Sequence, residues 1–347
     1  MKILFYISKN YSIPIIEPLV KYFNKRTIEF SFFVSDKVLK AMPDYWKEIE
    51  VITFLQDAID YNPDFVLVPG NFVDFRIPGI KVELFHGLAI EKKSHYKIRH
   101  FFDAYFTSGK VVTDKFMKLQ QQHKYFFVKE TGWPKIDHIL NYNVKNLRKK
   151  FGISKNKKVI LFAPTHSRTM QSASMLIPQI SKIIKDDEIW FVKFHELMNQ
   201  HIVDNFTSRN QNIIQIKSYD ITPYLHIADV LVSDTSSVIY EFMILNKPIV
   251  TYNTKGRADK GLDIDDSLEL RIALDKISKY PQEYMKNYDE ILKEVNPYLD
   301  GNISKNILDS LIEIKKKDLI PKKKKPLNLF RKAQILFHER YNKGYLR

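Results

Sequence analysis

Short continuous apolar segments alternate with amphipathic segments along most of this 347-residue chain, and this alternation constrains the fold most strongly. In the first half, the strands predicted from apolar runs are 2–7, 28–34, 51–55, 65–69, 82–85, 104–107 and 125–128. In the second half they are 158–162, 189–193, 213–216, 230–233 and 248–252. Helices are predicted near 14–23 in the first half and near 175–184, 222–226 and 236–245 in the second. Continuous apolar strands separated by helices indicate parallel sheets that are buried on both faces.

The alternation falls into two blocks that meet in a polar segment, residues 141–157. We therefore predict an α/β protein with two Rossmann-like domains facing a cleft. The predicted boundaries are 1–145 for the N-terminal domain and 146–314 for the C-terminal domain, followed by a basic tail over 315–347.

The sequence lacks an apolar run long enough to span a membrane, a signal-peptide pattern and cysteine, and these absences narrow the classes of protein to which it can belong. No apolar run approaches the roughly 18–20 residues that a membrane-spanning helix needs. The first residues, 1–7, are typical of a short buried strand rather than of a signal peptide. The chain has no cysteine, which excludes disulfides and thiol chemistry. Together these features predict a cytoplasmic protein.

The basic excess lies mostly in the tail. Residues 315–347 contain twelve Lys and Arg against Asp318 and Glu339, which is +10 of the net charge of +15 and leaves +5 for the rest. Within the tail, 327–338 has helical periodicity, with Leu329, Phe330, Ala333, Leu336 and Phe337 on one face. A basic amphipathic helix favours attachment to an anionic membrane surface. Packing on the N-terminal domain and a solvated tail remain alternatives.

In open parallel sheets, ligands bind where strands end and helices begin. One such turn, Ser233–Ser237, contains five small polar residues between a predicted strand and a predicted helix. A helix N-terminus with adjacent hydroxyl groups suits a phosphate group. The alternative is an ordinary helix cap, because Ser, Thr and Asp are the preferred capping residues.

Two histidines follow other predicted strands. His86 precedes Gly87 and a basic segment, and a histidine at this place can take a proton near neutral pH. Lys193 and His195 end a strand of the second block. The next histidine, His201, is six positions on, whereas zinc ligands on one helical face are four apart. The alternative for each histidine is a hydrogen-bonded loop residue.

In their order along the chain, these turns resemble the CDP-glycerol glycerophosphotransferase family, the polymerases and primases of teichoic acid and related capsule polymers. The resemblance covers roughly residues 80–305. The matching motifs are His86-Gly87, Thr131-Gly132-x-Pro134-x-x-Asp137, Ala163-Pro164-Thr165, Lys193-x-His195, Ser233-Asp234-x-Ser236-Ser237, Lys247-Pro248 and Asp300-Gly301-x-x-Ser304.

The resemblance implies two GT-B-type domains, the first on the acceptor side and the second binding the CDP donor. It implies transfer of glycerol phosphate, or a related polyol phosphate, to a hydroxyl of a lipid-linked or saccharide acceptor, with release of CMP. The site is expected to use no cofactor and no metal. The enzyme is then expected on the inner face of the cell membrane, held peripherally by its tail, with no nucleic-acid partner because no recognition motif accompanies the basic charge.

The resemblance also implies roles for single residues. His86 matches the histidine that acts as base on the acceptor hydroxyl, and His195 matches the second essential histidine, near the donor phosphates. The residues expected to bind the donor phosphates or nucleotide are Gly87, Thr131, Gly132, Pro164, Thr165, Arg168, Lys193, Asp234, Thr235, Ser236, Ser237 and Glu241.

Two motifs depart from the family pattern. The family often has Asp-Tyr-Ser-Ser where this chain has Thr235 in second place, and often has Trp at the position of His166. These departures leave open whether the polyol is glycerol or ribitol, and which acceptor is used. A GT-B glycosyltransferase that uses a nucleotide-sugar, or a sugar-nucleotide epimerase, is the alternative function on the same fold.

Overall fold

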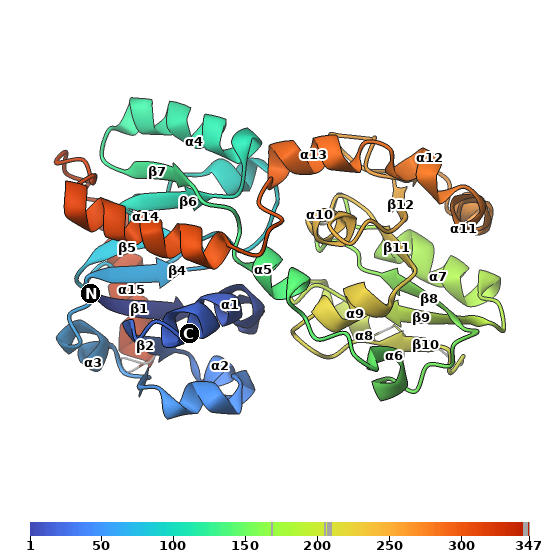
Figure 1. The fold of residues 1–347 in the computed structure, drawn as a ribbon, viewed down its shortest axis with the longest axis horizontal. Helices are drawn as coiled ribbons and strands as arrows, with labels where there is room; N and C mark the ends of the chain where they lie inside the picture. The colour runs from blue at the N-terminus through green and yellow to red at the C-terminus, as the bar shows by residue number, and fades with distance from the viewer. Residues whose placement is uncertain (168, 205, 207–209, 343–345, 347) are drawn as a thin grey trace. The chain divides into compact units, whose positions relative to one another are not determined.

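The computed structural model describes residues 1–167, 169–204, 206, 210–342 and 346. The chain divides into two compact units (Figure 1). The first unit contains 1–88, 93–141 and 295–347, and the second contains 89–92 and 142–294. Each unit is an α/β domain built on one parallel sheet, as predicted.

The described strands of the first unit form a seven-stranded parallel sheet in the order β3-β2-β1-β4-β5-β6-β7. The strands are β1 (Lys2–Ile7), β2 (Glu29–Val34), β3 (Val51–Ile52), β4 (Phe65–Val68), β5 (Ile80–Glu83), β6 (Ala104–Thr107) and β7 (Phe127–Glu130). The helices are α1 (Ile13–Asn24), α2 (Asp36–Ala41), α3 (Leu55–Asp60), α4 (Lys110–His123), α5 (Lys135–Leu140), α14 (Ile303–Lys317) and α15 (Leu329–Asn342).

The second unit has a six-stranded parallel sheet among its described residues, in the order β10-β9-β8-β11-β12-β13. Its strands are β8 (Lys158–Phe162), β9 (Glu188–Val192), β10 (Ile213–Gln215), β11 (Val230–Ser233), β12 (Ile249–Tyr252) and β13 (Leu262–Ile264). Its helices are α6 (Leu147–Lys150), α7 (Ala173–Ile183), α8 (Gln200–Asp204), α9 (Thr222–Ile227), α10 (Val238–Met243), α11 (Leu270–Lys279), α12 (Pro281–Met285) and α13 (Tyr288–Val295), the last of which ends at the border of the unit.

Burial on both faces explains why continuous apolar runs become strands. Every residue of β4, β6 and β11 is buried, so these strands show no alternation of polar and apolar side chains. Each predicted strand corresponds to an observed one. The short strand β13 was not predicted, because its sequence, Leu-Asp-Ile, has no apolar run and it lies at the sheet edge.

The C-terminal segment returns to the first unit. In α14, Ser304 donates from its backbone N–H and its hydroxyl to Asp137 Oδ2, both at 2.8 Å, and Ile303 N donates to Asp137 Oδ1 at 3.2 Å. Lys315 forms an ion pair with Asp64 at 2.8 Å. The predicted domain end at 314 is therefore wrong, because the second unit ends at 294 and α14 packs near α1 and α5 (Figure 1).

No helix in the described part of the chain is both long enough and apolar enough to cross a membrane.

Candidate active site

The second sheet has a topological switch point between β8 and β11. From β8 the chain proceeds to β9 and β10 on one side, and from β11 to β12 and β13 on the other. In such sheets, ligands bind in the crevice beyond the carboxyl ends of the strands at the switch point. The turn after β8 contains Pro164 and Thr165, and the turn after β11 contains Asp234–Ser237. Predicted site residues of the second unit thus meet at this edge.

Asp234 is the buried centre of these turns. Its side chain is 0% exposed, and its oxygens accept bonds from Thr165 N at 2.9 Å and from Ser172 N and Oγ at 2.8 Å each. Burial raises the pKa of Asp234, although the bonds from Thr165 and Ser172 oppose that shift. Because the carboxylate is surrounded by donors of the chain, it shapes the two turns rather than facing a ligand.

The hydroxyl residues after Asp234 differ in their exposure. Thr235 is buried, and its Oγ1 accepts a bond from Lys255 N at 2.9 Å. Ser236 and Ser237 are half-buried and precede α10, which begins at Val238 rather than near Ser236 as predicted. They therefore lie in the turn, at a place where a ligand can reach their hydroxyls. Glu241 is buried within α10.

His195 lies beyond the end of β9, the strand next to β8, and is exposed. Its Nδ1 accepts a bond from Leu197 N at 3.1 Å, so the neutral ring carries its proton on Nε2. Lys193, two residues earlier, is half-buried. The ring of His166 lies against the ring of His195, with a centroid distance of 4.1 Å.

His166 was noted in the sequence only as a departure from the family pattern. Its Nδ1 is buried and has no hydrogen-bond partner within the described residues. Burial lowers the pKa of His166, and the charge of Lys92 lowers it further. A neutral imidazole with an unsatisfied ring nitrogen at this edge is suited to a bound ligand or water. The neighbouring Arg168, also predicted for the site, lies outside the described residues.

Lys92 was missed as a site residue. Although it follows a strand of the first unit, residues 89–92 belong to the second unit, where Lys92 Nζ donates to Thr165 Oγ1 at 3.0 Å. Burial lowers the pKa of Lys92, while Asp234 and Glu91 favour its charged form. Glu91 is held by Lys260 at 2.9 Å and by the hydroxyl of Tyr240. The clustering of lysines after Gly87 was the only signal in the sequence.

In the first unit, His86 lies beyond the carboxyl end of β5 and is exposed. Its ring is 5.8 Å from that of Tyr11, which follows β1. The preceding residue, Phe85, has a φ of +61°, a strained conformation for a bulky side chain. Trp133 Nε1 donates to the Phe85 carbonyl at 3.1 Å and helps to hold this turn. The positive φ of Phe85 thus lies in the turn just before His86, and the following Gly87 is buried.

Glu83 lies in β5, three residues before His86, and is buried. Burial raises its pKa to about 8, and the charge of Arg99 opposes the shift. The carboxyl group is therefore mostly protonated at neutral pH. Glu83, the last residue of β5, therefore adds little negative charge near His86, where a carboxylate would repel a phosphate.

Three predicted motif residues are explained by packing. Thr131 is 0% exposed, and its hydroxyl donates to the Gly132 carbonyl at 3.0 Å. Gly132 has a φ of +87°, and a Cβ there would lie 2.7 Å from Ile303 Cγ1. Lys247 Nζ donates to the carbonyls of Leu225, His226 and Ala228 and so caps α9. The geometry accounts for these residues without a ligand.

The chain is similar in sequence to one family of transferases and to two teichoic acid primases. The sequence model of the family described as CDP-Glycerol:Poly(glycerophosphate) glycerophosphotransferase matches residues 83–313. A teichoic acid glycerol-phosphate primase of Bacillus subtilis (strain 168) is 32% identical over 191 residues, which are 51% of this chain and 49% of that protein. A primase of the same description from Bacillus spizizenii is 25% identical over 84% of this chain and 74% of its own length. The chain thus spans about half the length of the first of these relatives.

Solved structures show the same fold. The wall teichoic acid polymerase TagF superposes with a TM-score of 0.69 at 17% identity, covering 92% of this chain and 90% of that one. The UDP-GlcNAc 2-epimerase from Neisseria meningitidis, bound to UDP-GlcNAc, has a TM-score of 0.59 at 18% identity, covering 90% of this chain and 100% of that one. Two parallel-sheet domains of this kind are therefore shared by enzymes with different chemistry.

Proposed function

This chain belongs to the CDP-glycerol:poly(glycerophosphate) glycerophosphotransferase family, and from that premise we propose that it transfers glycerol phosphate, or a related polyol phosphate, from a CDP-activated donor to an acceptor hydroxyl. The product is a teichoic acid-like or capsule polymer of the cell envelope. The observation that carries the proposal is that Lys92 contacts Thr165 beyond β8, while His195 and the Ser236–Ser237 pair follow the neighbouring strands β9 and β11 at the same edge of the second sheet. A TagF variant soaked with CDPG has also been solved, with a TM-score of 0.69.

The proposed step is a displacement at the β-phosphorus of the donor. The acceptor oxygen forms the new O–P bond, the bond to CMP breaks, and CMP leaves with the electron pair. His86 takes the proton of the attacking hydroxyl. In the second unit, Lys92 and the hydroxyls of Ser236 and Ser237 bind the diphosphate, and His195 with its Nε2–H stabilises the charge that develops on the phosphoryl oxygens. The acceptor is a lipid-linked or saccharide hydroxyl.

Release of CMP tests this function directly. The purified chain is incubated with CDP-glycerol, CDP-ribitol, UDP-glucose or UDP-GlcNAc, together with a lipid-linked saccharide acceptor. We expect CMP from a CDP-polyol and neither UDP nor epimerised sugar from the UDP compounds. His195→Ala should lower CMP release by about 10²-fold or more, because it removes a donor to the developing charge. The exposed His201 serves as the matched control, since His201→Ala should retain the wild-type rate. UDP release without CMP release would instead assign the chain to the glycosyltransferases.

We also propose that the tail places the enzyme on the anionic inner surface of the cell membrane. The side of α15 that packs on the rest of the first unit is not the predicted apolar face. Arg331 and Lys332 lie over the rings of Phe101 and Phe75, and Ile335 is buried. The predicted apolar face is exposed, with Leu329 at 68%, Phe330 at 78%, Leu336 at 45% and Phe337 at 59%. An exposed apolar face beside a basic segment fits a lipid surface better than packing on the domain.

The apolar face gives a test that leaves the packed side intact. Leu329→Ser, Phe330→Ser and Phe337→Ser together should reduce sedimentation with phosphatidylglycerol liposomes at least tenfold, because the insertion of these side chains is lost. The control replaces three exposed apolar residues of the second unit, Val144, Leu268 and Ile272, by serine. If both triple variants sediment as the wild type does, the tail does not hold the protein on membranes.

A further inference from the structure

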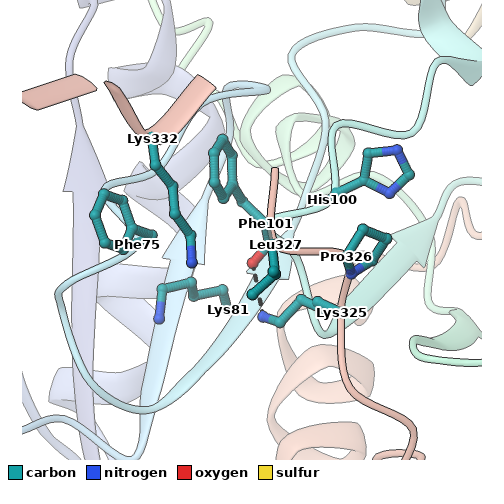
Figure 2. A pocket seen from close by; sticks show the side chains of 8 residues that line it. All are labelled: Phe75, Lys81, His100, Phe101, Lys325, Pro326, Leu327 and Lys332. Carbon is teal, nitrogen blue, oxygen red and sulfur yellow. Dashed lines mark hydrogen bonds between the residues drawn. The ribbon is translucent and has the colours of Figure 1, made fainter. Parts of the chain in front are cut away.

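A cavity of about 150 Å³ lies in the first unit, between the sheet and the tail. Lys81, His100 and Phe101 line it from the sheet side, together with Phe75, and Lys325 and Lys332 line it from the tail (Figure 2). A cavity of this size holds several water molecules. It is therefore large enough for one phosphate group, and the tail forms part of its wall.

The three lysines enter the cavity from separate segments (Figure 2). Lys81, in β5, is 6% exposed, and its Nζ donates to the Ile77 carbonyl at 2.6 Å. Lys325 donates to the Phe101 carbonyl at 2.9 Å and pairs with Asp103 at 2.6 Å. Lys332 Nζ lies 4.9 Å from the centre of the Phe75 ring. None of the described lining residues is acidic. The carboxylates nearby are Asp103, which pairs with Lys325, and Asp74, whose charge also acts on Lys81.

Burial and neighbouring positive charges both lower the pKa values of Lys81 and His100 at the cavity. Burial lowers the pKa of Lys81 to about 8; the charge of Lys325 adds to the shift, while Asp103 and Asp74 oppose it. Burial also lowers the pKa of His100, as do His123 and Arg331. An anion in the cavity would remove this repulsion and compensate the buried charge.

The cavity is separate from the candidate active site. Lys81 is the second residue of β5, and His100 and Phe101 precede β6, so the cavity lies at the amino ends of these strands. His86 follows the carboxyl end of the same strand β5. Substrates of open parallel sheets bind at the carboxyl ends, so the reaction proposed above does not account for a basic cavity at the amino ends.

We propose that this cavity binds a phosphate group, with Lys81, Lys325 and Lys332 as its cationic ligands and the tail as its closing wall. Ammonium groups form strong charge-assisted hydrogen bonds with phosphate oxygens. The rings of Phe75 and Phe101 supply an apolar wall beside the lysines, which suits the carbon side of a phosphate ester. The phosphate belongs either to an anionic lipid headgroup or to a free phosphate ester.

Lysine footprinting on the full chain tests the site locally. The protein is acylated with an amine-reactive ester, with and without inorganic phosphate at constant ionic strength, and the modified lysines are quantified by mass spectrometry. We expect phosphate to slow modification of Lys325 and Lys332 at least fivefold. Lys322 and Lys324 are exposed lysines of the same tail that do not line the cavity, and they should change less than twofold. Equal protection of all four, or of none, would overturn the proposal.

A charge-matched pair of variants gives a second measurement. Lys325→Gln with Lys332→Gln should abolish the increase in melting temperature that inorganic phosphate produces, because a ligand stabilises only the protein that binds it. Lys322→Gln with Lys324→Gln removes the same charge and should keep the increase. Identical behaviour of the two variants would show diffuse attraction rather than a site. Because neither measurement uses catalysis, the result does not depend on the proposed transferase activity.

The source of the phosphate is distinguished by repeating the footprint with vesicles. Vesicles of phosphatidylcholine with about one-third phosphatidylglycerol are compared with inorganic phosphate at equal phosphate concentration. Stronger protection of Lys325 and Lys332 by the vesicles assigns the site to a lipid headgroup, and stronger protection by the soluble anion assigns it to a free phosphate. If vesicles protect all four lysines equally and inorganic phosphate protects none selectively, only the tail as a whole adsorbs to the membrane and the cavity is not a phosphate site.

Discussion

His86→Ala is expected to lower kcat for CMP release by about 10²–10⁴-fold, the usual contribution of a well-placed general base. This corresponds to about 3–5 kcal/mol of activation free energy. The KM for the CDP-polyol should change little, because the proposed donor ligands Lys92, Ser236 and Ser237 belong to the second unit. Steady-state kinetics with varied donor, at saturating acceptor, separates the two constants.

The bond from Trp133 that helps to hold the strained turn does not involve the His86 imidazole, so a loss of kcat in His86→Ala can be assigned to the missing imidazole. Phe85 keeps its positive φ only because the surroundings hold it, including the bond from Trp133 to its carbonyl. Removal of an exposed imidazole leaves those contacts in place, so the variant should fold normally. His123 is the control because it is the last residue of α4 and lies near the amino end of β7, whereas His86 lies beyond the carboxyl end of β5. His123→Ala should therefore keep the wild-type kcat. A kcat for His86→Ala within threefold of the wild-type value would remove His86 from the mechanism.

Asp234→Ala is expected to destabilise the second unit by about 3–5 kcal/mol, because it leaves three buried donors without their acceptor. Those donors are Thr165 N, Ser172 N and Ser172 Oγ. They frame the turn after β8 and the start of α7, so the same change should also weaken donor binding. Urea denaturation followed by fluorescence reports on this unit through Trp190, which is fully buried beside β8.

Asp229 offers a carboxylate with a similar role and a different environment. It lies just before the same strand, β11, and accepts a bond from Val159 N at 2.8 Å, but its side chain is 46% exposed. Water can satisfy Val159 N after the change, so Asp229→Ala should cost less than about 1 kcal/mol. Comparable losses for the two variants would show that burial of Asp234 has no special importance for the site.

The sequence alone determined the strands and the order of the polar turns. A strand buried on both faces needs an uninterrupted apolar run, and this requirement is local, so β1, β6, β8 and β11 were predicted with their observed bounds. Because the turns follow those strands, the positions of His86, His195 and Ser236–Ser237 beyond strand ends could be predicted as well.

Contacts between distant segments were decided by the tertiary structure. Residues 295–347 belong to the first unit because Asp137 binds the start of α14, 166 residues further along the chain, and periodicity carries no such information. Lys92 entered the candidate site for the same reason, through Thr165, 73 residues away. In α15, helical spacing grouped the apolar side chains on one face but did not predict that the basic side would pack, with Arg331 and Lys332 over the rings of Phe101 and Phe75. Local spacing decides which side chains share a face, whereas the surface available at long range decides which face is buried.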